Sequence, residues 1–480
     1  MKKIIMIGMA ALVALSLQAC RKMLDIKPND RLLEDAVFGE RNGVYGVLNG
    51  IYTSMAAADS YGQGFTMTVP DLLAQYYSSY QSSYNSLVQG NYVGSDVHLL
   101  TDSLWSSSYN LVLQTNILMG HVKRDQGNGL TESDRNILLG ETHAIRAFLH
   151  FDLLRLFGPV YSIDSNAISI PYNTGEIQQI YKILPAVDVM RQIQSDLDSA
   201  ASYLANDPVI TNGITNTFDI VVGNNFMQRR NLRLNYYAVR ALQARVALYR
   251  GDKASAQVFA QEVITKTDTI FTWAPSDASL PGSVNQDLTF SSEIIFGLFN
   301  SGLYNSYRSL FSPSNATVLK PDENGLLSFY EKNINDFRYR GWWRQDPNGV
   351  QKSRTFYRYV EPTTNAANPN PIQLYMQPLI RLSEVYYIAA ETAPDPVTAV
   401  DLLNTVRLHR GLSSLDANTD LNKEIANEYR KDFWGEGQLF YYYKRKNALT
   451  IPTTAGTGTT ISFISSRYVI PLPLSESLNR

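Results

Sequence analysis

The stretch 131–159, TESDRNILLGETHAIRAFLHFDLLRLFGP, carries the strongest helical pattern in the chain. It opens on Thr131 with Asp134 three residues later, a spacing typical of a helix N-terminus. Apolar residues then recur at helical intervals from Ile137 to Leu156, and Gly158-Pro159 ends the pattern. The sequence therefore predicts a long helix here, around which the rest of the fold is organised.

Helical spacing recurs on both sides of this stretch, and several of the predicted helices form pairs. Residues 233–265 predict a hairpin that turns at Gly251-Asp252, with Ala residues on both helices. Its length of about 34 residues is typical of a tetratricopeptide-like repeat. A second hairpin is predicted over 379–410. Further helices are predicted at 38–55, 104–119 and 187–204, the last of which could pair with 137–157. We expect a mainly α fold in which such hairpins stack.

Two regions lack this pattern and are rich in Ser, Asn, Thr, Tyr and Pro, namely 59–95 and 268–375. The second is too long to be a simple connector, so we expect a functional insertion with a few short strands. The sequence thus predicts one body at 20–480. It comprises a helical scaffold (about 38–58, 104–265 and 379–446) and a loop-rich, irregular ligand lobe (about 59–95 and 268–375).

The first twenty residues predict a lipoprotein signal peptide. Met1-Lys2-Lys3 is followed by an apolar stretch over 4–17, and Cys20 is the only cysteine in the chain. This arrangement resembles a bacterial lipobox, so we expect cleavage after residue 19 and lipidation of Cys20. Several acyl chains together would make a stable membrane anchor. The alternative is an ordinary secretory signal with a coincidental cysteine.

The composition and motifs exclude several function classes. The balance of 42 Lys+Arg against 44 Asp+Glu argues against nucleic-acid binding. None of the five His forms a zinc motif, and we find no nucleophile elbow, Walker loop or complete dinucleotide fingerprint. His143 and His150 are interpreted as packing residues. Glu141 and Asp152 are about 16 Å apart along a helix, too far for a glycosidase pair. We expect no enzymatic activity, no metal and no cofactor.

Six segments in order resemble the SusD/RagB family of nutrient-binding outer-membrane lipoproteins. They are Cys20–Pro28, Trp105 with Tyr109 and Asn116, Leu139–Pro159, Arg381–Glu391, Leu402–Arg407 and Tyr468–Pro473. One motif departs from the family: Asp432 stands for the usual Glu and Gln438 for the usual Arg, which predicts an altered ion pair at that corner.

The resemblance implies the fold described above and a function outside the cell. It implies a lipid-anchored protein of the outer membrane, facing the exterior, that binds a glycan and acts as the lid of a TonB-dependent SusC-like transporter. The alternatives are a RagB-like protein that binds peptides, and a structural partner of the transporter that binds no nutrient.

A glycan site needs flat aromatic rings edged by polar side chains. Both lobe regions contain this mixture. The candidate ligand-binding residues are Tyr61, Phe65, Tyr76, Tyr77, Tyr80, Trp273, Tyr304, Tyr307, Trp342, Trp343 and Arg344. The alternative is that these rings fill small cores beneath the loops.

Overall fold

The computed structural model describes residues 34, 36–124, 127–216, 225–283, 286–361 and 371–478. The expected signal peptide and the lipidation site Cys20 lie outside the described residues. No helix in the described ranges is both long and apolar enough to span a bilayer.

Long helices form most of the scaffold, which confirms the expected fold class. They are α3 (Arg41–Met55), α6 (Ser95–Arg124), α7 (Glu132–Phe157), α8 (Ala186–Tyr203), α10 (Tyr236–Tyr249), α11 (Lys253–Ile264), α15 (Leu382–Thr392), α16 (Pro396–Leu408), α17 (Leu421–Asp432) and α18 (Gln438–Lys446). Shorter helical segments are α9 (Pro208–Asn212), α19 (Leu474–Leu478), η3 (Leu204–Asn206), η4 (Arg230–Leu232) and η7 (Ser465–Tyr468).

Helix α7 lies at the centre of the scaffold, and every residue from Ile137 to Phe157 is buried. Its first turn is held by a capping box. The Asp134 backbone N–H donates to the Thr131 hydroxyl, and the Thr131 N–H donates to the Asp134 carboxylate. Helices α6 and α8 pack along α7. A helix that is buried all round must be a core element.

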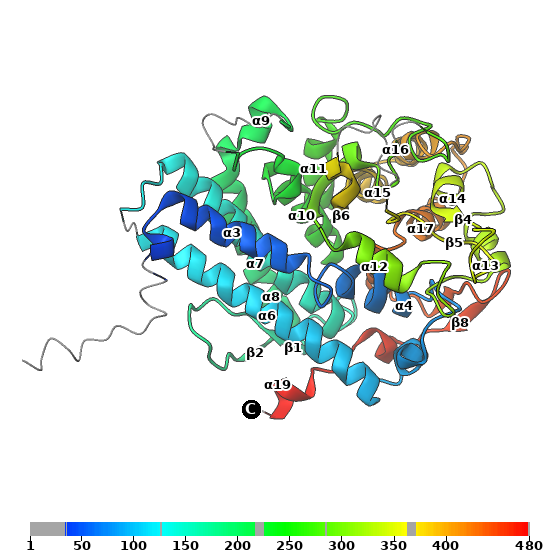
Figure 1. Cartoon of the computed structure of the whole chain (residues 1–480), viewed down its shortest axis with the longest axis horizontal. Helices are drawn as coiled ribbons and strands as arrows, with labels where there is room; N and C mark the ends of the chain where they lie inside the picture. The colour runs from blue at the N-terminus through cyan, green and yellow to red at the C-terminus, as the bar shows by residue number, and fades with distance from the viewer. Residues whose placement is uncertain are drawn as a thin grey trace, which may run out of the picture.

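The two predicted hairpins are present as α10–α11 and α15–α16, and α11 packs against α15 (Figure 1). Small side chains allow this close approach, since Ala238, Ala256 and Ala260 are fully buried. The pairing expected between 137–157 and 187–204 is also confirmed by the contact of α7 with α8.

Within the described residues, the strands form four two-stranded antiparallel pairs. They are β1 (Ile168–Pro171) with β2 (Ile183–Pro185), β3 (Ile294–Phe299) with β6 (Met376–Arg381), β4 (Trp343–Arg344) with β5 (Thr355–Phe356), and β7 (Thr450–Pro452) with β8 (Thr460–Ser462). The β3–β6 pair joins the lobe to the scaffold. Residues 379–381, expected to begin a helix, belong to β6 instead. A short run of buried apolar residues has the same sequence pattern in a helix and in a strand.

The insertion contains the short strands that were expected, and also short helices, which were not predicted from the sequence. They are η5 (Ser291–Glu293), α12 (Leu303–Leu310), α13 (Glu323–Phe329), α14 (Phe337–Trp342) and η6 (Pro371–Tyr375). Figure 1 shows the start of α3 at one end of the longest axis, and β4, β5 and α13 of the lobe at the other.

The expectation of an open, irregular loop over 59–95 is corrected in part. This segment contains the π-helical turn η1 (Gly64–Thr68), α4 (Val69–Leu73), η2 (Ser82–Tyr84) and α5 (Asn85–Gln89). Most of 60–77 is buried. Its polar side chains satisfy the backbone locally; the Thr66 hydroxyl, for example, donates to the Tyr61 carbonyl at 2.8 Å. Polar composition therefore marked a buried irregular segment rather than a surface loop.

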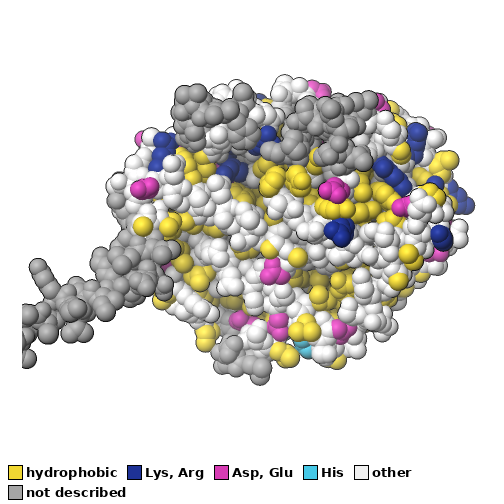
Figure 2. Space-filling model, in the orientation of Figure 1, with side chains coloured by type: hydrophobic (Ala, Val, Ile, Leu, Met, Phe, Trp, Pro, Cys, Tyr) yellow, Lys and Arg dark blue, Asp and Glu magenta, His cyan; other side chains and the backbone are white. Residues whose placement is uncertain are grey.

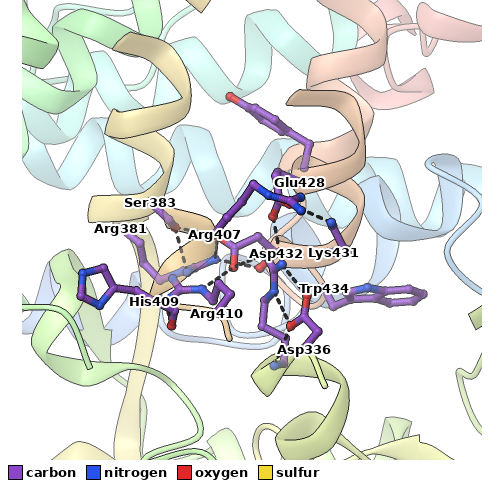
Figure 3. A network of polar contacts seen from close by, with 12 residues as sticks. Asp336, Arg381, Ser383, Arg407, His409, Arg410, Glu428, Lys431, Asp432 and Trp434 are labelled. Carbon is purple, nitrogen blue, oxygen red and sulfur yellow. Dashed lines mark hydrogen bonds and ion pairs between the residues drawn. The ribbon is translucent and has the colours of Figure 1, made fainter. Parts of the chain in front are cut away.

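A buried ion-pair network connects the lobe to the scaffold (Figure 3). Asp432 of α17 lies among three guanidinium groups, with nitrogen–oxygen distances of 3.1 Å to Arg381, 3.3 Å to Arg338 and 3.5 Å to Arg410. The Ser383 hydroxyl also donates to it at 2.6 Å. Aspartate at this position thus keeps its ion pairs. These contacts join side chains from β6, from α14 and from the residues just after α16, and so connect the lobe to the scaffold.

Gln438, the second departure from the family motif, also has a buried partner. Its side-chain oxygen accepts a hydrogen bond from Arg155 of α7 at 3.0 Å. Arg155 is in turn paired with Asp152. A neutral acceptor at position 438 suits this corner because the guanidinium of Arg155 already lies there.

Candidate ligand-binding site

Most of the aromatic residues proposed from the sequence lie in the core. The buried set comprises Tyr61, Phe65, Tyr76, Tyr77, Trp273, Trp342 and Trp343. Tyr76 stacks on Trp434 with ring centroids 3.9 Å apart, and Trp343 meets the same ring edge-on at 4.8 Å. The Trp342 indole N–H donates to the Leu288 carbonyl at 2.7 Å. This packing corrects the expectation of an exposed platform built from these rings and favours the core alternative for them.

The remaining proposed residues reach the surface or its edge. Tyr80, Tyr304 and Arg344 are half-buried, whereas Tyr307 is buried directly beside Tyr304. The Arg344 side chain donates to the Gly341 carbonyl at 3.1 Å and lies over the ring of Tyr357. Of the aromatic residues proposed from the insertion, Tyr304 alone is more than marginally exposed, and the buried Tyr307 packs beside it.

Three further rings lie on either side of this pair along the chain: Tyr357 contacts Tyr307, and Phe299 packs on Tyr375 across the turn at 300–302. We name the set Phe299, Tyr304, Tyr307, Tyr357 and Tyr375 the tyrosine face. Ring centroids are 6.2 Å apart for Tyr304–Tyr307, 5.9 Å for Tyr307–Tyr357 and 5.5 Å for Phe299–Tyr375. Phe299 is 46% exposed although it ends a strand that is otherwise buried.

A tight turn holds the two halves of the tyrosine face together. The Asn300 N–H donates to the Tyr375 carbonyl at 2.8 Å, and the Asn300 side chain accepts from the Gly302 N–H at 2.8 Å. The Asn300 amide also donates to the Gln377 side chain at 2.7 Å. The chain therefore passes from Phe299 at the end of β3 to Tyr304 in the first turn of α12 along a fixed path.

Charged side chains border the tyrosine face. The guanidinium of Arg308 lies 5.7 Å from the ring centre of Tyr304, and that of Arg344 lies 5.5 Å from Tyr357. Burial, with Tyr357 and Asp346 nearby, raises the pKa of Tyr307. Its phenol therefore stays protonated at neutral pH and remains a hydrogen-bond donor.

The two lobe regions proposed from the sequence do meet at this site. The Gln63 amide donates to the Ser306 hydroxyl of α12 at 3.1 Å. Further along, the N–H groups of Ser78 and Ser79 both donate to the Lys320 carbonyl at 3.0 Å. Figure 2 shows hydrophobic side chains, with a few basic and acidic ones among them, gathered over the part of the surface where α12 lies.

Sequence reasoning missed Phe299, Tyr357 and Tyr375. Phe299 continues an apolar run, IIFGLF, that predicts a buried strand at every position. Tyr357 and Tyr375 are two of 30 tyrosines and carry no motif. The only signal in the sequence was the density of Tyr and Phe across the insertion, which points to a region and not to individual residues.

The titratable residues singled out in α7 take part in structural contacts. His143 and Arg146 both bond to the Asp196 carboxylate of α8, at 2.8 and 2.7 Å. Tyr52 donates to Glu141 at 2.7 Å, and Glu141 is also paired with the buried Arg230. In the described part of the chain, no three His, Cys, Asp or Glu side chains are grouped as metal ligands would be.

The fold and the tyrosine face define a mainly helical repeat protein that displays half-buried rings on a loop-rich lobe. Residues 22–214 match the family model described as "Starch-binding associating with outer membrane", and residues 328–458 match the model of the SusD family. The chain belongs to the SusD/RagB family. Among curated proteins, no relative matches.

Solved structures share the fold over almost the whole chain. A SusD superfamily protein from Bacteroides thetaiotaomicron is 22% identical with a TM-score of 0.68, covering 91% of this chain and 97% of its own. A putative sugar binding protein from Bacteroides vulgatus is 21% identical with a TM-score of 0.68, covering 91% and 96%. A laminarin binding SusD-like protein is 18% identical with a TM-score of 0.64, covering 91% and 97%.

Proposed function

We propose that this protein binds a glycan on the tyrosine face, as a lipid-anchored component of the outer membrane. The observation that carries the proposal is the set of rings bordered by Arg308 and Arg344, of which Phe299 is exposed and Tyr304, Tyr357 and Tyr375 are half-buried. Phenol and phenyl faces pack against the apolar C–H faces of a sugar ring, while hydroxyl and guanidinium groups bond to its hydroxyls. Membership of a family whose model is described as starch-binding supports the same ligand class.

We further propose that the protein serves as the lid of a TonB-dependent SusC-like transporter, anchored through lipid on Cys20 and facing the exterior. The described chain begins beside the end of α6, where Glu34 bonds to His121 at 2.7 Å and Phe38 stacks on the same imidazole. Thirteen residues lie between Cys20 and Glu34, so their Cα atoms are at most about 50 Å apart. The body would therefore stay close to the membrane.

Glycan binding is tested with the chain lacking residues 1–20, by affinity electrophoresis and calorimetry against a panel of polysaccharides and peptide pools. We expect retardation by one glycan class, and its loss in the double variant Phe299→Ala with Tyr304→Ala. The matched control is Tyr203→Ala, which removes a half-buried tyrosine of α8. A heat of binding measured with peptide pools, but with no polysaccharide, would instead support the RagB-like, peptide-binding alternative. No detectable binding in any assay would support the alternative of a structural partner of the transporter that binds no nutrient.

The anchor and the partner need separate tests in the native organism. We expect Cys20→Ser to release the protein from the outer-membrane fraction and to abolish incorporation of labelled palmitate. The lid role predicts that a tagged protein co-purifies with a TonB-dependent transporter. Retention of the Cys20→Ser variant in the membrane would contradict the lipid anchor without bearing on glycan binding.

A further inference from the structure

A polar pocket of about 200 Å³ lies where the lobe meets the scaffold. Five short stretches of the chain form it: 214–216, 229–232, 270–272, 291–292 and 373–376. The side chains able to form hydrogen bonds are Asn216, Arg229, Asn231, Thr272, Ser291, Ser292 and Gln373. Aliphatic groups such as Leu232 and Ile270 complete the lining, to which no aromatic ring of the described residues contributes. The pocket thus offers amide, hydroxyl and guanidinium groups in a concave surface.

The backbone around the pocket is held in an unusual conformation. Arg229 and Phe290, which precedes Ser291, both have left-handed backbone angles, with φ values of 51° and 53°. Such angles are costly in residues other than glycine and persist where the surrounding structure imposes them. Here the Arg229 N–H donates to the Thr215 carbonyl at 2.9 Å, and the Thr272 N–H donates to the Ser292 carbonyl at 3.2 Å. These bonds tie the separate segments together.

The polar groups of the pocket are only partly used by the protein. The hydroxyl of Ser292 is buried and has no hydrogen-bond partner within the described ranges. The Ser291 hydroxyl donates to Asp287 at 2.8 Å, which leaves its oxygen able to accept a bond. A buried hydroxyl without a partner is unfavourable, so a ligand or ordered water that bonded to it would be stabilised.

The pocket and the tyrosine face share one short segment of chain. The turn η6 contributes Gln373 to the pocket and Tyr375 to the face, where the Tyr375 ring packs on Phe299. The next residue, Met376, lines the pocket and is the cross-strand partner of Phe299 in the β3–β6 pair. A ligand lying on Phe299 and Tyr375 therefore needs to extend past only this turn to reach the pocket.

We propose that the pocket is a second sugar subsite, and that the ligand is an oligosaccharide extending from the tyrosine face across η6 into it. This inference rests on the proposed glycan-binding function and specifies its ligand as a chain of several sugar units. The two sites differ in chemistry. The face contributes ring stacking, whereas the pocket contributes hydrogen bonds to the hydroxyl rim of one further sugar. The pocket would therefore add selectivity for chain length and for hydroxyl configuration.

The test measures affinity against chain length by calorimetry. The probes are malto- and laminari-oligosaccharides of two to seven glucose units, together with the size-fractionated hydrolysate of any other polysaccharide that retards the wild-type protein. The pocket variant combines Ser292→Ala with Gln373→Ala, two small changes that leave the backbone path intact. The face variant is Tyr304→Ala, and the matched control is the exposed Gln178→Ala.

We expect the affinity of the wild-type protein to increase with chain length. The pocket variant should lose about three- to tenfold in affinity for the longest probes and bind the shortest ones as the wild type does. Tyr304→Ala should weaken binding of every probe. If the pocket variant binds long probes like the wild type while Tyr304→Ala is impaired, the inference is wrong and the proposed function stands.

A structure with a bound heptasaccharide provides a check that does not depend on variants. Sugar density in the pocket, within hydrogen-bond distance of Ser292 or Gln373, would support the inference. Sugar on the tyrosine face with solvent alone in the pocket would overturn it. A wild-type protein that binds no glycan at all would overturn both this inference and the proposed function.

Discussion

Arg338 of the lobe and Glu428 of the scaffold form a salt bridge of 2.9 Å in which both side chains are fully buried. Arg338 also pairs with Asp336 at 2.6 Å, so one guanidinium is shared between the start of α14 and the face of α17. A charge removed from water in this way is tolerated only while its partners are present. The lobe and the scaffold are therefore coupled through this residue.

Replacing this arginine should destabilise the whole protein. Arg338→Met leaves the buried Asp336 carboxylate without a counter-charge and removes one from Glu428, so we expect the free energy of unfolding to fall by about 3–5 kcal/mol. The measurement is chemical unfolding of the wild type and the variant in urea. The control is Arg191→Met, which breaks an exposed pair with Asp188 on α8 and should cost less than about 1 kcal/mol. Equal effects of the two substitutions would contradict the coupling.

Position 432 should require a negatively charged side chain and should also limit the size of that side chain. Asp432→Asn removes the carboxylate facing three arginines and should cost several kcal/mol, since each of these buried guanidinium groups would lose one of its counter-charges. Asp432→Glu restores the residue usual in the family but adds a methylene to a fully buried site. We expect it to cost about 1–3 kcal/mol. A Glu variant as stable as the wild type would show that the corner has room for the longer side chain.

His150 should make stability depend on pH. Its Nδ1 donates to the Arg146 carbonyl and its Nε2 accepts from the Asn173 N–H at 3.0 Å, so the ring is neutral. Burial lowers the pKa of His150 from 6.5 to about 4. The unfolded chain therefore binds more protons between these values, and stability falls as pH decreases from about 6.5 to 4. The full effect of this residue is about 3 kcal/mol.

The measurement for His150 is the free energy of unfolding from pH 7 to pH 5 in the wild type and in His150→Gln. Two buried carboxylates of the network titrate below this range, since the pKa of Glu428 is about 2 in the fold and that of Asp432 is also lowered by the neighbouring arginines. Burial also lowers the pKa of the half-buried His409, so both proteins retain some slope. We expect a shallower slope in the variant. Identical slopes would mean that His150 does not couple folding to protonation.

Substitutions of Trp343 and Phe299 should affect different properties: the first should lower the free energy of unfolding, and the second should weaken glycan binding. Trp343 is buried against Trp434, so Trp343→Ala creates a large cavity and should cost about 3–5 kcal/mol. Phe299 is partly exposed, so Phe299→Ala should change the thermal midpoint little and weaken glycan binding by about tenfold, the size of effect expected for an aromatic contact at an interface. Thermal unfolding and calorimetry on the same preparations distinguish the two. If the Trp343→Ala protein folded as stably as the wild type but no longer bound glycan, Trp343 would belong to the ligand-binding residues.

Local sequence patterns were sufficient to predict most helices of the scaffold. The spacing around Thr131 and Gly158 predicted α7, and the hairpin turn at Gly251-Asp252 predicted α10 and α11, because caps and turns depend on neighbouring residues. The length of α6 was underestimated. Its first turns, from Ser95, carry Val97, Leu100 and Leu104 at helical spacing, a pattern that the sequence interpretation did not use.

The sequence by itself determined the helical hairpins, the interrupted architecture and the resemblance to the SusD/RagB family, since these depend on periodicity and on motifs in order. Only the tertiary structure decided which rings are core and which form the tyrosine face. Tyr76 and Tyr304 look alike in sequence, each among uncharged polar neighbours. Tyr76 is buried because Trp434, more than 350 residues away, stacks on it. Burial of an aromatic ring is decided by long-range packing, and that information is not local.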